Sequence, residues 1–107
     1  MKRRARARLQ FIVFMNPAQS DNVRARRILC VDDEPTVREL LHIYLRREGF
    51  EVETAPDGLA AWLIISAHPS RFDAVITDNQ MPHMTGLELV EKLRVAQGQL
   101  DHFANAL

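Results

Sequence analysis

Residues 28–35 form a short apolar run followed by three acids and a proline: Ile28-Leu29-Cys30-Val31-Asp32-Asp33-Glu34-Pro35. A continuous apolar run of this length is typical of a strand that is buried on both faces, as strands are in parallel sheets. Pro35 suits the first position of a helix, and the acids before it complement the positive end of the helix dipole. The stretch therefore predicts a buried strand followed at once by a helix.

The same alternation of strand and helix continues along the chain. Gly49 ends the first helix, Phe50–Ala55 reads as a second strand, and Pro56-Asp57-Gly58 is a turn into a second helix. A third strand at Phe72–Thr77 ends in Asp78, and the loop Asn79–Thr85 leads through Gly86 into a third helix. Three such repeats imply right-handed crossovers and a parallel sheet covered on both sides. We predict an α/β fold, a flavodoxin-like doubly wound sheet with the strands in the order 2-1-3.

Apolar spacing predicts which side of each helix faces the sheet. We expect Trp62 and Ile65 to lie off the core face of the second helix, either as a partner surface or as partly buried side chains. The inward faces should carry these residues: Val37, Leu40, Leu41, Tyr44 and Leu45 in the first helix; Ala60, Leu63, Ile64 and Ala67 in the second; Leu89, Val90, Leu93 and Ala96 in the third.

The chain has 107 residues, enough for one small domain, and its formal net charge of zero conceals a split. Residues 1–27 carry a balance of +7 and residues 28–107 a balance of −7. We expect residues 1–26 to be a basic, disordered leader, because they show no sustained period and contain a run of turn formers at residues 16–22. The arginine-rich residues 2–8 could bind nucleic acid or an anionic membrane, but a leader without such a role is the favoured interpretation.

Cysteine content and hydropathy indicate the compartment. The single cysteine, Cys30, excludes an internal disulfide and suggests a reducing environment, in which a buried and inert thiol is expected rather than a redox sensor. No run reaches the roughly 18 apolar residues that span a bilayer. We therefore expect a cytoplasmic protein with no membrane partner and no nucleic-acid partner.

Acidic side chains follow two strands that the order 2-1-3 makes neighbours. Asp32 and Asp33 follow the first strand, Asp78 ends the third, and ligands bind at such a switch point beyond the carboxyl ends of the strands. Adjacent strands lie roughly 4.8 Å apart, so the three carboxylates must crowd one small volume and repel one another unless a cation intervenes. Mg²⁺ prefers such oxygen ligands. We predict Mg²⁺ bound by Asp32, Asp33, Asp78 and the backbone carbonyl of Gln80, with Asp78 as the nucleophile in phosphoryl transfer.

Three motifs give the chain a specific resemblance. Residues 28–35, Ala55-Pro56-Asp57-Gly58 and residues 73–86 closely resemble the response-regulator receiver family in order and spacing, over about residues 27–95. The resemblance implies that Asp78 accepts a phosphoryl group from a histidine kinase or phosphotransfer protein, and that Asp32, Asp33 and the Gln80 carbonyl hold magnesium. It also implies a signalling module in a phosphorelay and not an enzyme.

The chain departs from that family after the third helix. A complete receiver has two further strand–helix units, which carry a switch Ser/Thr and a phosphate-binding Lys. After Thr85 this sequence has no Ser or Thr, and after Lys92 it has no Lys. We therefore expect a partial receiver at residues 27–97, truncated after the third helix, that binds metal weakly and has impaired phosphorylation and switching. Its third strand would be an exposed edge through which the chain could self-associate.

Other interpretations remain open at this point. A pseudo-receiver could bind protein or nucleic acid without phosphorylation, and an aspartyl phosphohydrolase is disfavoured because Gln80 stands where such enzymes need a second acid. We expect ordinary surface histidines, with His83 the one nearest the site. The tail at residues 98–107 carries apolar side chains at helical spacing, which predicts either a short helix over the exposed edge or on another chain, or a frayed end: Leu100, Phe103, Ala104 and Leu107.

Overall fold

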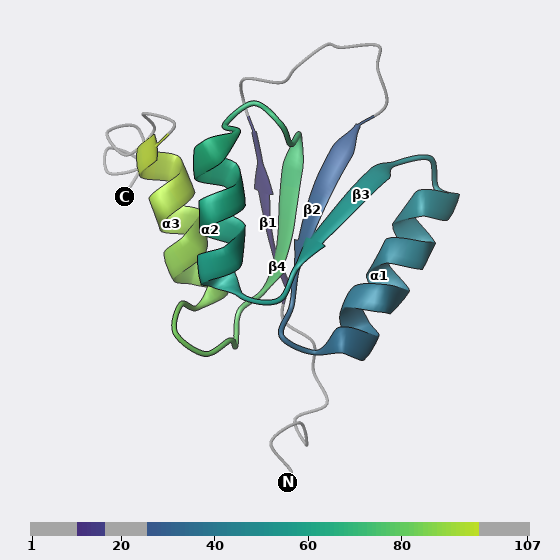
Figure 1. The fold of residues 1–107 in the computed structure, drawn as a ribbon, viewed down its shortest axis with the longest axis horizontal. Helices are drawn as coiled ribbons and strands as arrows, with labels where there is room; N and C mark the ends of the chain where they lie inside the picture. The colour runs from purple at the N-terminus through teal and green to yellow at the C-terminus, as the bar shows by residue number, and fades with distance from the viewer. Residues whose placement is uncertain (1–10, 17–25, 97–107) are drawn as a thin grey trace, which may run out of the picture.

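The computed structural model describes residues 11–16 and 26–96, and it contains a sheet of strands with helices on both faces (Figure 1). In chain order the elements are β1 (Phe11–Met15), β2 (Arg27–Val31), α1 (Pro35–Arg47), β3 (Glu51–Ala55), α2 (Gly58–Ala67), β4 (Ala74–Asp78) and α3 (Gly86–Ala96). Helix α1 lies on one side of the sheet, and α2 and α3 lie side by side on the other (Figure 1). Within the described ranges, no helix has the length and hydropathy that crossing a bilayer requires.

The sheet has the order β1-β4-β2-β3. Strand β2 pairs in parallel with β3 and with β4, so the three strands expected from the sequence lie in the expected order and direction. The α/β class and the doubly wound arrangement of these strands are confirmed. The sheet differs from the expectation in one respect, a fourth strand at its edge.

Strand β1 corrects the prediction for the start of the chain. We expected a leader without regular structure at residues 1–26, but Phe11–Met15 form a strand that pairs antiparallel with β4, from Phe11 opposite Asp78 to Met15 opposite Ala74. Phe14 reaches the core, and Asn16 after the strand donates from Nδ2 to the carbonyl of Phe72 at 2.9 Å. These contacts stabilise a segment whose sequence is too short to show a period.

A second correction follows from the position of β1. The edge of β4 that was expected to be exposed is occupied along its whole length. The expected self-association through that strand therefore loses its basis, because the backbone groups of β4 are paired on both sides. The remainder of the expected leader, and the expected tail at residues 98–107, lie outside the described residues.

The core is divided by the sheet into two unequal parts. The larger lies under α2 and α3, where Leu29, Val31 and Val75 of the sheet pack with side chains such as Ala61 and Leu89. The smaller lies under α1 and is formed by four buried residues, Ile28, Cys30, Leu45 and Ala74. Most of the apolar area that leaves water on folding is thus on the side of α2 and α3, which makes that side the main source of hydrophobic stabilisation.

The helix faces agree with the expectation only in part. In α3, Leu89, Val90 and Leu93 are buried as predicted. In α2 the predicted inward face is displaced by about one residue from the observed one. Ala61 and Ile65 are buried, whereas Leu63 is 60% exposed. The sequence of α2 is apolar all round, so its period could not identify the inward side.

In α1 only Leu45 of the expected stripe is fully buried. Leu40 and Tyr44 are 61% and 59% exposed, although both were expected to face the sheet. Leu41 is partly buried and packs against the smaller core. Helix α1 contacts β3 and β2 at one side of the sheet, so it covers too narrow a strip to bury the whole stripe.

Candidate functional site

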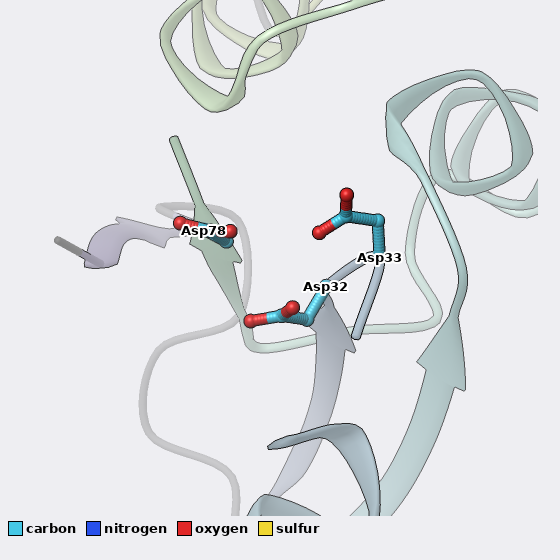
Figure 2. A group of neighbouring side chains, drawn as sticks. All are labelled: Asp32, Asp33 and Asp78. Atoms are coloured by element: carbon cyan, nitrogen blue, oxygen red, sulfur yellow. The ribbon is translucent and has the colours of Figure 1, made fainter. Parts of the chain in front are cut away.

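Three carboxylates meet at the carboxyl ends of β2 and β4. One oxygen from each of Asp32, Asp33 and Asp78 lies within 4.8 Å of the other two. Figure 2 shows that Asp32 and Asp33 follow one strand while Asp78 ends its neighbour. Asp32 and Asp78 are 2% and 7% exposed, and Asp33 is half-buried. The sequence prediction that these side chains share one small volume is therefore confirmed.

The turn between β2 and α1 fixes Asp32. Its backbone N–H donates to the carbonyl of Ala55 at 3.2 Å, which continues the ladder to β3 for one residue beyond the strand. Its Oδ1 accepts from the N–H of Glu34 at 2.8 Å, and its carbonyl accepts from Nη1 of Arg38 at 2.8 Å. The Asx-type bond to Glu34 turns the chain sharply into α1 and sets the direction of the carboxylate.

Asp78 is held by the sheet and by the loop that follows it. Its backbone pairs with Phe11 of β1, and its Oδ1 accepts from the N–H of Gln80 at 3.3 Å. Close packing behind it requires a glycine: a Cβ on Gly86 would lie 2.5 Å from the carbonyl oxygen of Asp78, a distance that real Cβ contacts do not show. The start of α3 therefore packs directly against the backbone of Asp78.

A capping box, which the sequence analysis missed, fixes the far end of the loop. The N–H of Thr85 donates to Oε1 of Glu88 at 2.9 Å, and the N–H of Glu88 donates to Oγ1 of Thr85 at 3.1 Å. Asn79, beside Asp78, accepts from the N–H of Leu87 at 3.0 Å through Oδ1. The Thr-x-x-Glu spacing was the signal that could have identified these two residues. Loop and helix are thereby joined into one unit behind the carboxylates.

The donor set of this site fits a hard divalent cation. Mg²⁺ binds through one or a few carboxylates together with other oxygen ligands, and two of the three carboxylates here are buried, where uncompensated negative charge is costly. Asp32, Asp33 and Asp78 are the residues that could hold such an ion. The coordinating role expected for the Gln80 carbonyl stays a prediction, as its N–H is the group seen to contact Asp78.

Sequence comparison identifies the family. The sequence model of the response regulator receiver domain matches residues 28–103. The chain belongs to this family. Among curated relatives, this receiver domain is 43% identical over 67 residues to the probable transcriptional regulatory protein TcrX of Mycobacterium tuberculosis, and 41% identical over 69 residues to the response regulator GtcR of Aneurinibacillus migulanus. The matches cover 63% and 64% of this chain, and 28% of the length of each relative.

Solved structures agree with the assignment to the receiver family. The chemotaxis protein CheY4 of Vibrio cholerae superposes with a TM-score of 0.64 at 37% identity, over 71% of this receiver chain and 62% of that one. The response regulator TrrA of Thermotoga maritima, solved in complex with Mg²⁺-BeF, superposes with a TM-score of 0.55 at 33% identity, over 68% of this chain and 62% of that one. Both relatives support the flavodoxin-like fold predicted from the sequence.

Cys30, the histidines and Lys92 are not part of the acidic group of the receiver site. Burial raises the pKa of the Cys30 thiol to about 11, with a smaller contribution from the charge of Asp32, which agrees with the expected inert thiol. His42, His68 and His83 belong to no group of possible metal ligands among the described residues, and His102 lies outside them. Lys92 places its ammonium 4.9 Å from the centre of the Trp62 ring, on the α2–α3 side.

Proposed function

We propose that this chain is a phosphoacceptor module of a two-component phosphorelay, phosphorylated on Asp78 beside a magnesium ion. Asp32, Asp33, Asp78 and the backbone carbonyl of Gln80 would hold the ion. The observation that carries the proposal is the convergence of three carboxylates from two strand ends within 4.8 Å. Family membership supports the same conclusion, because receiver domains receive a phosphoryl group from a histidine kinase or a phosphotransfer protein.

The residues have distinct roles in the proposed transfer. A carboxylate oxygen of Asp78 forms a bond to phosphorus while the bond from phosphorus to the donor's imidazole nitrogen breaks, and the released imidazole takes up a proton. Asp78 is suited to this role because it ends a strand and precedes a loop. Asp33 would hold the ion directly, and Asp32 would hold it directly or through water. The ion supplies neutralisation of charge on the transferring group.

A second candidate is a pseudo-receiver that binds its partner without phosphorylation. The resemblance places the phosphate-binding lysine at the end of a later strand, whereas Lys92 belongs to α3 and has its ammonium over Trp62. If the second candidate is correct, an Asp78→Asn variant binds its partner as tightly as the wild type does. Loss of partner binding in that variant favours the phosphoacceptor instead.

Mass spectrometry after incubation with acetyl phosphate tests the first candidate. We expect a phosphoryl adduct on Asp78 that requires Mg²⁺, and no adduct on Asp78→Asn. Glu48→Gln is the matched control, because it also removes one carboxylate but lies at the C-cap of α1, roughly 20 Å along the helix from the acids. Absence of an adduct from wild-type protein in saturating Mg²⁺ would refute phosphoacceptor activity.

Thermal unfolding measures the ion separately from the transfer. An ion that binds only the folded chain raises the unfolding temperature as its concentration increases. We expect Mg²⁺ to raise the midpoint for the wild type and for Glu48→Gln, and to have little effect on Asp33→Asn. An equal rise in Asp33→Asn would remove this residue from the proposed ligand set.

A further inference from the structure

The side chain of Arg38 reaches back from the first turn of α1 to the acids that follow β2. Arg38 is the fourth residue of α1, and its N–H donates to the carbonyl of Glu34 at 3.1 Å, which closes that turn. Its Nη1 donates to the carbonyl of Asp32 at 2.8 Å. Because a guanidinium stays protonated at every pH at which proteins are folded, this bond fixes a permanent positive charge beside the acids.

The acceptor of this bond distinguishes Arg38 from two arginines elsewhere in the chain. Arg27 donates to Oε1 of Glu51 at 2.6 Å. Arg71 donates to Oε2 of Glu53 at 2.8 Å. Both of these guanidinium groups are bonded to a carboxylate, whereas the bond of Arg38 to a backbone carbonyl takes up no carboxylate oxygen. Arg38 therefore brings positive charge to the acids without using an oxygen that a metal ion would need.

The acids are placed so that this charge matters. One oxygen from each of Asp32, Asp33 and Asp78 lies within 4.8 Å of the other two, so three negative charges repel one another when no ion is bound. The bonded nitrogen of Arg38 lies within about 8 Å of the Asp32 carboxylate, since one residue separates them. Arg38 is half-buried and Asp32 is buried, so solvent and salt screen their attraction less than they would screen it at an exposed site.

We propose that Arg38 is a resident counter-charge, which stabilises the ion-free fold and lowers the affinity of the three acids for Mg²⁺. The inference rests on the proposed function, because it concerns the ion assigned there to Asp32, Asp33 and Asp78. Removal of the charge has two effects of opposite sign: the ion-free chain becomes less stable, and Mg²⁺ binds more tightly. A role in holding the turn alone would leave Mg²⁺ binding unchanged or weaken it, because the ligands would be less well arranged.

A Mg²⁺ titration followed by backbone amide NMR signals at constant ionic strength measures the first quantity, the dissociation constant. Arg38→Gln removes the charge and keeps an N–H donor, and we expect its dissociation constant to be about tenfold lower than that of the wild type. Arg38→Lys keeps the charge and should bind as the wild type does. Arg46→Gln is the matched control, because it removes the same charge from the last turn of α1, about 12 Å further along the helix, and should leave the constant unchanged.

The unfolding temperature without Mg²⁺ measures the second quantity, the stability of the ion-free fold. Arg38→Gln should lower this temperature in the wild-type background and lower it less in the Asp33→Asn background, where the acids carry one charge fewer. Because repulsion is reduced there, the double variant should fold even if Arg38→Gln alone does not. Equal lowering in both backgrounds would overturn the inference, since loss of the bond to the carbonyl would then account for it.

The titration distinguishes failure of this inference from failure of the proposed function. Mg²⁺ binding by the wild type, with an equal or higher dissociation constant in Arg38→Gln, would overturn the role of Arg38 and leave the ion site standing. Absence of Mg²⁺-dependent shifts from the wild type and from every variant would refute the ion site itself, and the inference with it.

Discussion

Strand β4 has two neighbours that differ in direction and in how they are buried. On one side, β2 runs parallel to it and buries Ile28 through Val31 on both faces of the sheet. On the other side, β1 runs antiparallel and buries Phe14 while Val13 and Met15 are 54% and 61% exposed. A central strand must be apolar throughout, whereas an edge strand needs only one buried face. This difference in burial explains why β2 was evident from the sequence and β1 was not.

The largest effect should come from Phe14, the residue that makes β1 part of the core. Phe14 is 5% exposed and belongs to the larger core with Val75 and Leu89. Phe14→Ala should lower the free energy of unfolding by about 3–5 kcal/mol, measured by urea denaturation, whereas Val13→Ala on the exposed face should change it by less than about 1 kcal/mol. Equal effects of the two substitutions would mean that β1 does not belong to the folded unit.

The pH dependence of the free energy of unfolding should report on Cys30 at the centre of the sheet, with a smaller effect than that of Phe14→Ala. Burial raises the pKa of Cys30 from 9.0 to about 11, so between these values the folded thiol keeps a proton that the unfolded thiol loses. The folded state then binds more protons, and stability falls by roughly 2–3 kcal/mol as the pH rises through this window. Urea denaturation between pH 9 and pH 11 should show this fall in the wild type and a shallower one in Cys30→Ala.

The edge strand provides the contrast to Cys30. A thiol introduced by Val13→Cys stands at a position that is 54% exposed, so iodoacetamide should alkylate it in the folded protein, while Cys30 should react only on unfolding. Rapid alkylation of Cys30 in the native wild type would contradict the burial of β2 at the centre of the sheet.

The smallest of these effects concerns the end of β1. Asn16 is 8% exposed; its N–H donates to the carbonyl of Asp73 at 2.8 Å and its Nδ2 donates to the carbonyl of Phe72. Asn16→Ala should cost about 1–3 kcal/mol in urea denaturation, because it leaves a buried carbonyl without its side-chain donor. Hydrogen exchange should then rise in β1 and stay unchanged in β2. Equal increases in both strands would show that β1 and β2 open as one unit.

Much of the fold and the site could be predicted because their signals are local. Asp32 and Asp33 follow β2 and Asp78 ends β4, in each case after a short apolar run, and a parallel sheet brings such strand ends together. The sequence predicted a loop that leads through Gly86 into the third helix. The contact of Gly86 with the carbonyl of Asp78 could not be predicted, because it depends on how α3 packs.

The parts that were missed depend on contacts between distant residues. Strand β1 is stabilised by residues about 60 positions away, such as Thr77 opposite Ile12, and no local period announces it. In α2, side chains around the whole helix are apolar, so only packing against the sheet selects Ala61 and Ile65 over Leu63. Propensity and spacing could not decide either case.

The direction of β1 also determines what is tethered to the acidic end of the sheet. Because Phe11 stands opposite Asp78, the chain that precedes Phe11 is attached there and not at the end where β2 begins. The sequence that leads to this end of β1 is strongly basic, with Lys2, Arg3, Arg4, Arg6 and Arg8 within the ten residues before Phe11.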